Sequence, residues 1–239
     1  MQFIHSHKVI PVFILLLFGF SVNAQKIKRT RGGEIDPMRY EVNPFHMGFT
    51  ITGDYGKFKI TPVQNILSQD SLLSIRTQGF PGFGLGGIMN LRLSSHWHLR
   101  ALPQLHFEQR NVFFQFKDRT DMIEVESVSF DLPLLVKYRG KRHNNYNLYV
   151  IGGTRFTHDF SAKQDKQRGP LIKQIALKKQ SVSYEFGFGL DIYTQYFKFS
   201  PEIKMSNSIT NMISKDSYIY NGSIDFLQTR LFQISFHFE

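Results

Sequence analysis

Alternation of apolar and polar side chains is the feature that most constrains the fold of this chain. In residues 96–110, HWHLRALPQLHFEQR, apolar residues fall on odd-numbered positions and polar or charged residues on even-numbered ones between Trp97 and Glu108. Only Leu102 breaks this pattern. A period of two places alternate side chains on opposite faces of a β-strand. The segment is therefore predicted to form a strand with one apolar face and one charged face, and the charged face must meet water or a polar interior.

The same alternation recurs along the chain. Seven further segments show it: residues 45–60, 83–94, 125–139, 146–158, 182–192, 197–205 and 232–239. Together with residues 96–110 they make eight predicted strands. After the N-terminal region, no continuous apolar run is long enough to form a membrane-spanning helix, so a helical membrane protein is excluded.

The connections between the predicted strands alternate between long and short. About twenty residues separate the first two strands, whereas little more than Ser94 and Ser95 separates the second from the third. A short acidic loop joins the third strand to the fourth. Residues 140–144 are also a short connection, and residues 158–181 and 206–227 are long ones. In outer-membrane barrels long loops face outside and short turns face the periplasm, so an even strand count would place both chain ends in the periplasm.

A soluble lipocalin-type barrel and a β-sandwich share the period-two pattern. Glycines on the polar face favour a narrow eight-stranded interior, where space is scarce. These are Gly48, Gly84, Gly86, Gly153, Gly187 and Gly189, while Gly53, Gly87 and Gly152 lie on the other face.

Aromatic residues on the apolar face lie near the short turns, as in the girdle of a membrane barrel. They are Phe45, Trp97, Tyr138, Tyr146, Phe197 and Phe238. The prediction is an all-β fold, an eight-stranded antiparallel up-and-down transmembrane β-barrel with a polar lumen filled by side chains. Because proline removes a ladder hydrogen bond, we expect bulges at Pro103, Pro133 and Pro201.

The N-terminus has the features of a secretory signal peptide. Lys8 precedes an apolar run over residues 9–20, and Ala24 stands before the expected cleavage at Gln25. The chain has no cysteine, so neither lipoprotein acylation nor a disulfide framework is expected. The predicted organisation is a signal peptide over residues 1–24, a periplasmic basic tail over 25–43, and a barrel over 44–239 in the outer membrane of a Gram-negative cell.

The charged face would point into the lumen of such a barrel. An eight-stranded interior is just wide enough for side chains to fill it. Because single buried charges are costly and opposite charges compensate one another, we expect these residues to pair as a plug rather than to line a water-filled pore. The predicted network consists of Arg92, Arg100, Glu108, Asp131, Lys137, Arg139, Glu185, Asp191, Lys198, Glu202 and Lys204.

No metal or cofactor site is predicted. His98 and His106 share the polar face, but eight residues of strand separate them by about 26 Å, so they cannot chelate one ion together. The best candidate for an enzyme that modifies lipid acyl chains is the group His158, Asp159 and Ser161. Neighbouring strand positions face opposite sides, and the chain has no G-x-S-x-G elbow. A non-enzymatic role is therefore preferred, with the lipid-modifying enzyme as the alternative.

The charge balance favours anionic partners. The chain has a formal net charge of +10, and residues 139–145 and 163–169 are basic. In a secreted chain these segments are expected to meet phosphate or carboxylate groups, such as lipid headgroups, or to stay solvated, and no nucleic acid is expected. The basic tail over residues 25–43 is either a disordered leader or a docking segment for an acidic partner.

Several segments together resemble the PorT family of Bacteroidetes outer-membrane proteins. They are NPFHMGFTITGDYGKFKI, PGFGLGG, LRALPQLHFEQRNVFF, SFDLPLLVKYRGKRHNNYNLYVIGGTRF, YFKFSPEIKMS and the terminal SFHFE. The resemblance implies a role in type IX protein secretion, in some members in gliding motility, with other secretion-system proteins and outer-membrane lipids as partners. It implies no enzyme activity and assigns no role to single residues. Glu239 after Phe238 departs from the terminal aromatic residue common to outer-membrane barrels.

Overall fold

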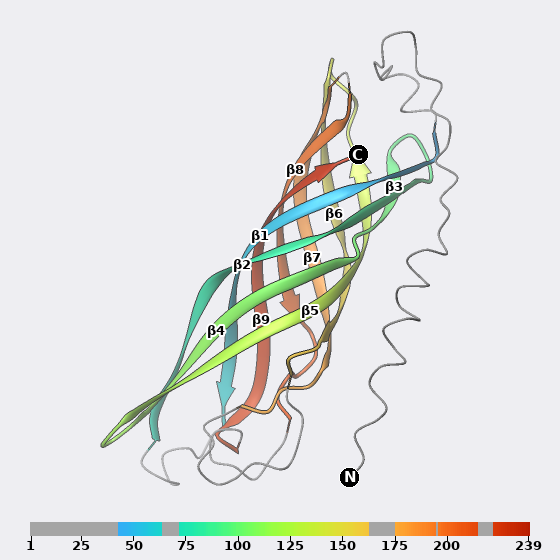
Figure 1. The fold of residues 1–239 in the computed structure, drawn as a ribbon. Helices are drawn as coiled ribbons and strands as arrows, with labels where there is room; N and C mark the ends of the chain where they lie inside the picture. Colours follow the sequence, from blue (N-terminus) through green and yellow to red (C-terminus); the bar gives the residue numbers. More distant parts are fainter. Residues whose placement is uncertain (1–42, 64–71, 163–174, 195, 215–221) are drawn as a thin grey trace, which may run out of the picture. The chain divides into compact units, whose positions relative to one another are not determined.

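The computed structural model describes residues 43–63, 72–162, 175–194, 196–214 and 222–239. The predicted signal peptide with its cleavage site at Ala24 and Gln25, the tail up to residue 42, and the basic segment 163–169 lie outside this part of the chain. The described residues form nine strands, which are labelled in Figure 1: β1 (Phe45–Pro62), β2 (Leu72–Arg92), β3 (Trp97–Ala101), β4 (Gln104–Phe116), β5 (Thr120–Arg139), β6 (Tyr146–Asp159), β7 (Gln180–Tyr193), β8 (Lys198–Ser208) and β9 (Ile224–Phe238). Within the described ranges, no helix has the length and apolarity needed to cross a membrane.

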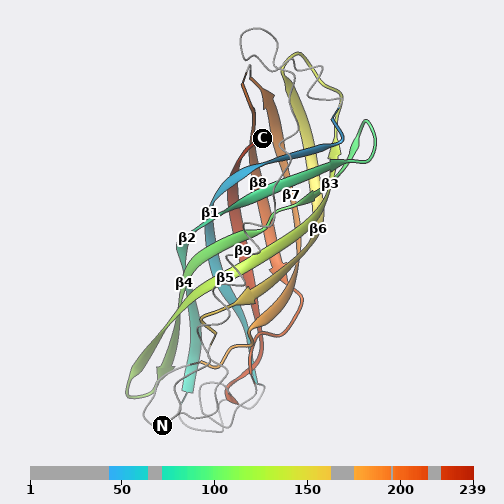
Figure 2. The ribbon, with the colours of Figure 1, turned by 45° about the vertical axis from the view of Figure 1, so that its right-hand side comes forward.

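The strands close into a ring of antiparallel neighbours. β1 pairs with β2 and also with β9, from Phe49 opposite Phe238 to Pro62 opposite Ile224. β3 and β4 occupy one position in the ring, because both pair with β2 on one side and with β5 on the other. The ring therefore has eight positions. Figures 1 and 2 show the closed barrel from two directions. The predicted eight-stranded antiparallel up-and-down barrel is confirmed.

Pro103 separates β3 from β4 without a change of register. Ala101 lies opposite Met89 and Gln104 opposite Gly86, so both segments keep the same alignment to β2. A proline removes one ladder hydrogen bond because it has no N–H, but it does not require an extra residue. The predicted bulge at Pro103 is therefore wrong.

The pairing also keeps its register across the two other prolines. Pro133 lies opposite Arg155 and Pro201 opposite Phe236, in register with the rest of their strands. The register of β2 against β4 shifts instead between Gly79 and Phe83. The bulges predicted at Pro133 and Pro201 are therefore also wrong.

Several strands are longer than predicted at the end of the barrel away from Phe45 and Phe238. β2 begins at Leu72, β4 and β5 continue to a three-residue connection, and β9 begins at Ile224. β2 has 21 residues and β5 has 20, whereas a barrel strand crosses a membrane with about 9–11. In Figures 1 and 2 the β4–β5 hairpin extends beyond the ends of β6 and β7. The strands thus continue past the length that a membrane requires.

The longer strands were missed because the alternation inverts its phase. In β1 the outward side chains change from Tyr55 to Lys57 and Lys59, while the inward ones change from Asp54 to Phe58. The predicted strands were defined by one constant apolar face, so the prediction stopped where the two faces exchange polarity. The predicted lengths of the connections change accordingly: the β1–β2 connection spans only residues 63–71, and the β4–β5 connection spans residues 117–119.

Beyond the inversion the barrel encloses an apolar core, called the distal core below. Two loop segments, residues 175–177 and 212–213, add their apolar side chains to it and are joined by a bridge between Leu177 and Ile213. The distal core consists of Phe58, Leu72, Val112, Phe114, Phe116, Ile123, Ala162, Ile175, Leu177, Met212, Ile213, Ile224 and Leu227. This end of the barrel therefore has the polarity of a soluble protein, with its apolar side chains inside.

The remaining part of the barrel has the reverse polarity, with apolar side chains outside. The predicted aromatic residues lie on this outer face near the short turns, where Trp97 packs on Tyr138 with ring centroids 4.9 Å apart. The inward glycines match a narrow lumen, since a Cβ on Gly84 would lie 2.5 Å from the His106 ring. At outward Gly53 nothing lies within 4 Å of such an atom. The closed ring and the apolar exterior exclude the β-sandwich and the soluble barrel.

Candidate functional site: the charged lumen

The lumen is lined by buried charged side chains of both signs. Among the described residues, seven cations and eight carboxylates are buried. An isolated buried charge costs several kcal/mol, and this cost is recovered only where charges pair with good geometry. The near balance of signs is therefore a condition for the stability of such an interior.

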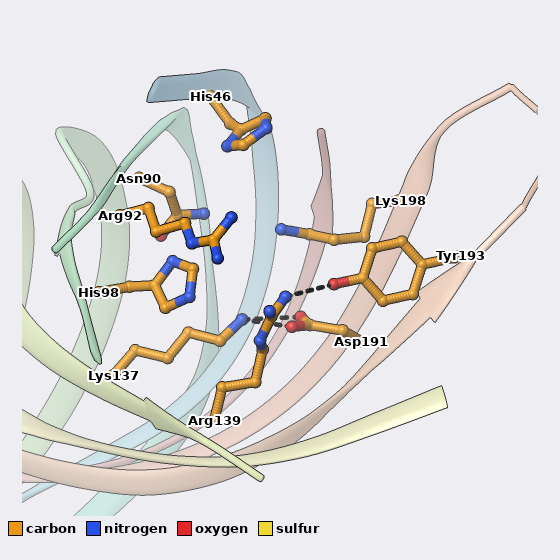
Figure 3. A pocket seen from close by; sticks show the side chains of 9 residues that line it. All are labelled: His46, Asn90, Arg92, His98, Lys137, Arg139, Asp191, Tyr193 and Lys198. Carbon is orange, nitrogen blue, oxygen red and sulfur yellow. Dashed lines mark hydrogen bonds and ion pairs between the residues drawn. The ribbon is translucent and has the colours of Figure 1, made fainter. Parts of the chain in front are cut away.

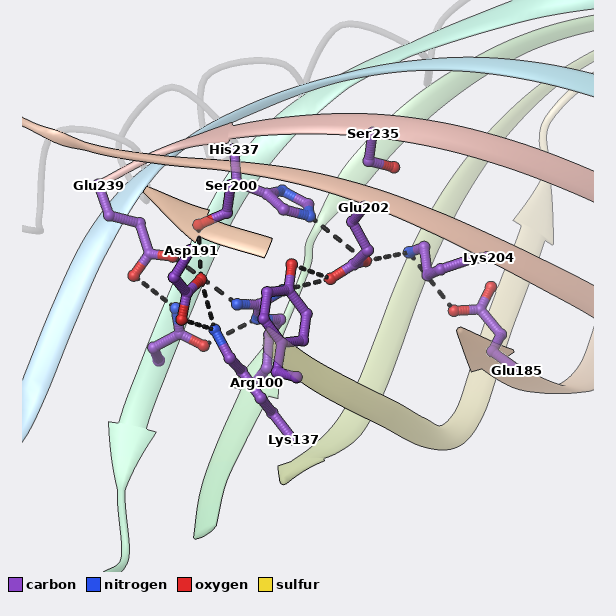
Figure 4. Close-up of polar contacts among 12 residues, drawn as sticks. Arg100, Lys137, Glu185, Asp191, Ser200, Glu202, Lys204, Ser235, His237 and Glu239 are labelled. Carbon is purple, nitrogen blue, oxygen red and sulfur yellow. Dashed lines mark hydrogen bonds and ion pairs between the residues drawn. The ribbon is translucent and has the colours of Figure 1, made fainter. Parts of the chain in front are cut away.

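Arg100 and Glu202 form the centre of the lumen. Nη1 of Arg100 lies 2.5 Å from Oε2 of Glu202, and Nε of Arg100 donates to Oδ1 of Asn90 at 2.9 Å. The Tyr149 hydroxyl also donates to Glu202, at 2.9 Å, and Nε2 of His237 lies 3.3 Å from the other Glu202 oxygen. Figure 4 shows Arg100 from β3 and His237 from β9 pointing toward the carboxylate of Glu202 on β8. The pair thus connects opposite walls of the barrel.

Toward the end with the short turns, two further ion pairs follow. Lys137 Nζ contacts both carboxylate oxygens of Asp191, at 2.8 and 2.6 Å, and the Ser200 hydroxyl donates to Asp191 at 2.7 Å. Lys198 Nζ lies 2.8 Å from a carboxylate oxygen of Glu239. Each carboxylate in this half of the lumen therefore contacts at least one cation.

In the other direction, charges of alternating sign continue toward the distal core. Lys204 lies between Glu202 and Glu185, at 3.7 and 3.6 Å, and Arg155 lies between Glu185 and Asp131, at 3.3 and 3.5 Å. The series of contacts then passes from Asp131 to His106 and from His106 to Asp54, at 3.7 and 2.9 Å.

The series ends where the distal core begins. Arg110 pairs with Glu108, and its guanidinium lies over the ring of Phe58, 5.0 Å from the centroid. The described lumen is thus filled by side chains up to this apolar layer.

The structure brings most of the predicted network together. All the predicted charges except Arg92 are buried in the lumen: Arg100, Glu108, Asp131, Lys137, Arg139, Glu185, Asp191, Lys198, Glu202 and Lys204. Arg139 donates to the Tyr193 hydroxyl at 2.8 Å. Arg92 is half-buried at the mouth of the barrel, where its Nε donates to the Ser94 carbonyl at 3.3 Å.

Several members of the network were not predicted. Asp54 follows Thr50 and Thr52 at period two, and Glu239 follows Ser235 and His237 in the same way, so both carboxylates could have been found by extending the inward phase. Arg110, Arg155 and Asp159 are also buried in the lumen. Leu102, which breaks the alternation, packs inside the lumen in a small apolar cluster with Ile88, Leu135, Tyr149 and Ile151.

One group of described residues has the spacing of metal ligands. Asp54, His106 and Glu108 place one ligand atom each within 4.8 Å of one another. Nδ1 of His106 is hydrogen-bonded to Oδ2 of Asp54 at 2.9 Å, and Glu108 is paired with Arg110. Asp54 and His106 therefore already bond to each other, and Glu108 to the guanidinium of Arg110. We assign these three residues to the ion-pair network.

Two of the three candidate catalytic residues, Asp159 and Ser161, make hydrogen bonds at a turn. Asp159 Oδ1 accepts hydrogen bonds from the backbone N–H groups of Ser161 and Ala162, and its Oδ2 accepts one from the Ser127 hydroxyl. Ser161 Oγ accepts the N–H of Val128 at 3.1 Å. The His158 ring packs on Phe160 at a centroid distance of 5.2 Å. The described contacts thus do not include the serine–histidine hydrogen bond that a nucleophilic site requires.

Two solved structures illustrate what the chain is similar to. OprG from Pseudomonas aeruginosa is 11% identical with a TM-score of 0.42, over 80% of this chain and 93% of that one. Ail of Yersinia pestis is 12% identical with a TM-score of 0.31, over 80% and 97%. No curated protein matches the chain.

Because these TM-scores are low, the assignment rests on the closed ring and on a family profile. The profile of the outer membrane protein beta-barrel domain matches residues 23–214, which is more than half of the chain. The chain therefore belongs to the outer membrane protein beta-barrel domain family and is an outer-membrane protein.

Proposed function

We propose that this barrel is a non-enzymatic component or accessory of the type IX protein secretion system. It acts through contacts at its two ends and not by conducting solutes through its lumen. The observation that carries this proposal is the filled interior, in which the series of ion pairs from Lys198 to Arg110 is followed by the distal core. The link to secretion, and in some members to gliding motility, comes from the sequence resemblance to the PorT family.

The proposed orientation follows other outer-membrane barrels. Short turns of such barrels face the periplasm and longer loops face outside. In this orientation both chain ends and the turns at residues 93–96, 140–145 and 194–197 are periplasmic. The apolar outer face then meets outer-membrane lipids, and other secretion-system proteins meet the ends of the barrel.

Deletion of the gene in the source organism tests the proposal. We expect type IX cargo, quantified by mass spectrometry of the culture medium, to fall in the deletion strain and to return with the wild-type gene. The abundance of an unrelated outer-membrane barrel serves as the control for general damage to the membrane. Normal cargo export in the deletion strain would contradict the proposal.

Two substitutions separate the proposed role from the lipid-modifying alternative. His158→Ala and Ser161→Ala are expected to leave both cargo export and the acyl composition of outer-membrane lipids unchanged, because neither side chain is part of a nucleophile–base pair. A change of lipid acylation in either variant would favour the enzyme.

A further inference from the structure

Cationic side chains surround a small cavity at the mouth of the barrel next to the short turns. Figure 3 shows side chains from several strands converging on this cavity, whose volume is about 10 Å³. Its lining includes the cations Arg92, Lys137, Arg139 and Lys198 and a single carboxylate, Asp191. The cavity thus has enough space for one water-sized group.

The mouth differs from the rest of the lumen in its charge. Four basic side chains line the cavity with one carboxylate, and Glu239, which contacts Lys198, adds a second carboxylate, so basic groups outnumber carboxylates by two among the described residues. Among the other buried charged residues that the structure describes, seven carboxylates outnumber four cations. A recess with walls of one sign concentrates ions of the opposite sign. The mouth is therefore a place where an anion would be stabilised.

His98 provides a second, independent observation. Its side chain lines the cavity and the residue is only 8% exposed. In the part of the chain that the structure describes, Nε2 of His98 has no hydrogen-bond partner. A buried polar atom without a partner costs about 1–3 kcal/mol, and such atoms are commonly satisfied by a bound water or ligand. The imidazole thus offers an N–H in the tautomer protonated at Nε2.

We propose that the mouth of the barrel is a binding site for one oxyanion, a carboxylate or a phosphate. One oxygen of the anion occupies the cavity and accepts a hydrogen bond from Nε2 of His98. Arg92, which is half-buried at the rim, and Arg139 supply the neighbouring positive charge. The rest of the anion lies toward the opening. This site follows from its own geometry and does not depend on the proposed role in secretion.

The anion can come from two sources with the same chemistry. An acidic side chain of a protein segment can enter the mouth, or a small free anion can occupy it. The acidic segment would bind more tightly than free acetate, because neighbouring carboxylates would also meet the basic turn that carries Lys141 and Arg142.

Nuclear magnetic resonance of the full-length barrel in zwitterionic micelles tests the site. The titrants are sodium acetate, inorganic phosphate and a synthetic hexaglutamate peptide, each added to protein in a buffer without oxyanions at constant ionic strength. We expect saturable shifts of the His98 imidazole and of the amides of residues 90–92 and 137–139. Arg92→Gln should weaken binding about tenfold, as expected for one charge-assisted hydrogen bond.

Arg76→Gln is the matched control, because Arg76 is an exposed arginine near the opposite end of the same strand, β2. It should leave binding unchanged. Folding of each variant is checked by its heat-dependent mobility in gel electrophoresis. If Arg92→Gln does not fold, His98→Leu provides the same test, since it removes Nε2 in a side chain of similar volume.

Each outcome bears on the proposal. Tighter binding of hexaglutamate than of acetate supports the site and assigns it to a protein segment. Equal binding supports the site and assigns it to a free anion. Shifts that do not saturate, no shift with any titrant, or equal weakening by Arg76→Gln would overturn it.

Discussion

Arg100 and Glu202 face each other across the barrel from opposite positions in the ring of strands. Three strands separate β3 from β8 in either direction, yet the guanidinium and the carboxylate lie 2.5 Å apart with both side chains fully buried. A contact of this kind fixes the width of the lumen at its centre. It also makes each partner dependent on the other, because neither charge can reach water.

Replacing one partner of this pair is expected to destabilise the barrel strongly. Arg100→Leu or Glu202→Leu should each lower the free energy of unfolding by ~3–5 kcal/mol, because the remaining charge stays buried without its partner. Denaturant unfolding of the refolded protein in detergent measures the loss. The double variant should lose less than the sum of the two single losses.

Arg230→Leu is the control for this prediction, since Arg230 is exposed and its Nε donates to Oδ1 of Asn207 at 3.1 Å. It should change stability by less than ~1 kcal/mol. Equal effects of Arg100→Leu and Arg230→Leu would show that the central pair is not a stability determinant.

The filled lumen predicts a barrel that is closed to ions. Purified protein reconstituted in a planar bilayer should give no lasting conductance, because ion pairs and the distal core fill the described lumen. Protein-free bilayers and a general porin define the two limits of the measurement. A stable, large open conductance would contradict the plug.

The distal core is expected to stabilise the loop end of the barrel by itself. Phe114→Ala should cost ~3–5 kcal/mol, because the side chain is fully buried in the core. Phe113→Ala, at the neighbouring outward position, should cost clearly less. Hydrogen exchange measures the local effect: the amides of Lys178 and Ser214, which bond across the two loop segments, should lose protection in Phe114→Ala. Unchanged protection of these amides would show that the two loop segments do not depend on the distal core for their stability.

The proposed orientation can be tested by single cysteines, since the chain has none of its own. Lys117→Cys lies in the connection between β4 and β5, and Lys141→Cys lies in a turn at the other end. Both lysines are exposed. A membrane-impermeant maleimide added to intact cells should label Lys117→Cys, and Lys141→Cys only after the outer membrane is permeabilised. The reverse labelling pattern would show that the barrel has the opposite orientation in the membrane.

The basic tail before β1 provides a test of the docking hypothesis. Deleting residues 26–36, with the signal peptide and cleavage site kept, should leave barrel abundance and heat resistance normal but lower the export of type IX cargo. The physical reason is the loss of a cationic segment that could dock on an acidic partner. Normal export from a normally abundant truncated barrel would contradict the docking hypothesis and support the alternative that the tail is a disordered leader.

The face of each strand could be predicted from the sequence, whereas most partners in the lumen could not. Leu99 and Arg100 were assigned to opposite faces because a strand alternates its side chains. The contact between Arg100 and Glu202 depends on how the ring closes between β1 and β9, and this alignment is set by pairing between strands far apart in the chain.

The distal core was missed although its signal is present in the sequence. Tyr55 is followed by Lys57 and Lys59 in the outward phase, and Asp54 by Phe58 in the inward phase. A search for one constant apolar face cannot detect such an inversion. The mouth cavity was missed for another reason, because His46, His98 and Tyr193 come together only when β1, β3 and β7 are placed around the ring.

In the proposed orientation, the inversion of polarity in β1 also determines how deep the protein sits in the bilayer. Moving the barrel inward would carry Lys57 and Lys59 from water into hydrocarbon, at a cost that rises to about 2–4 kcal/mol for each charge at the bilayer midplane. Moving it outward would expose Ile51 and Tyr55, the outward side chains next to the inversion, to water. Vertical displacement is opposed in both directions, so the distal core and its loops are held at a constant height above the membrane surface.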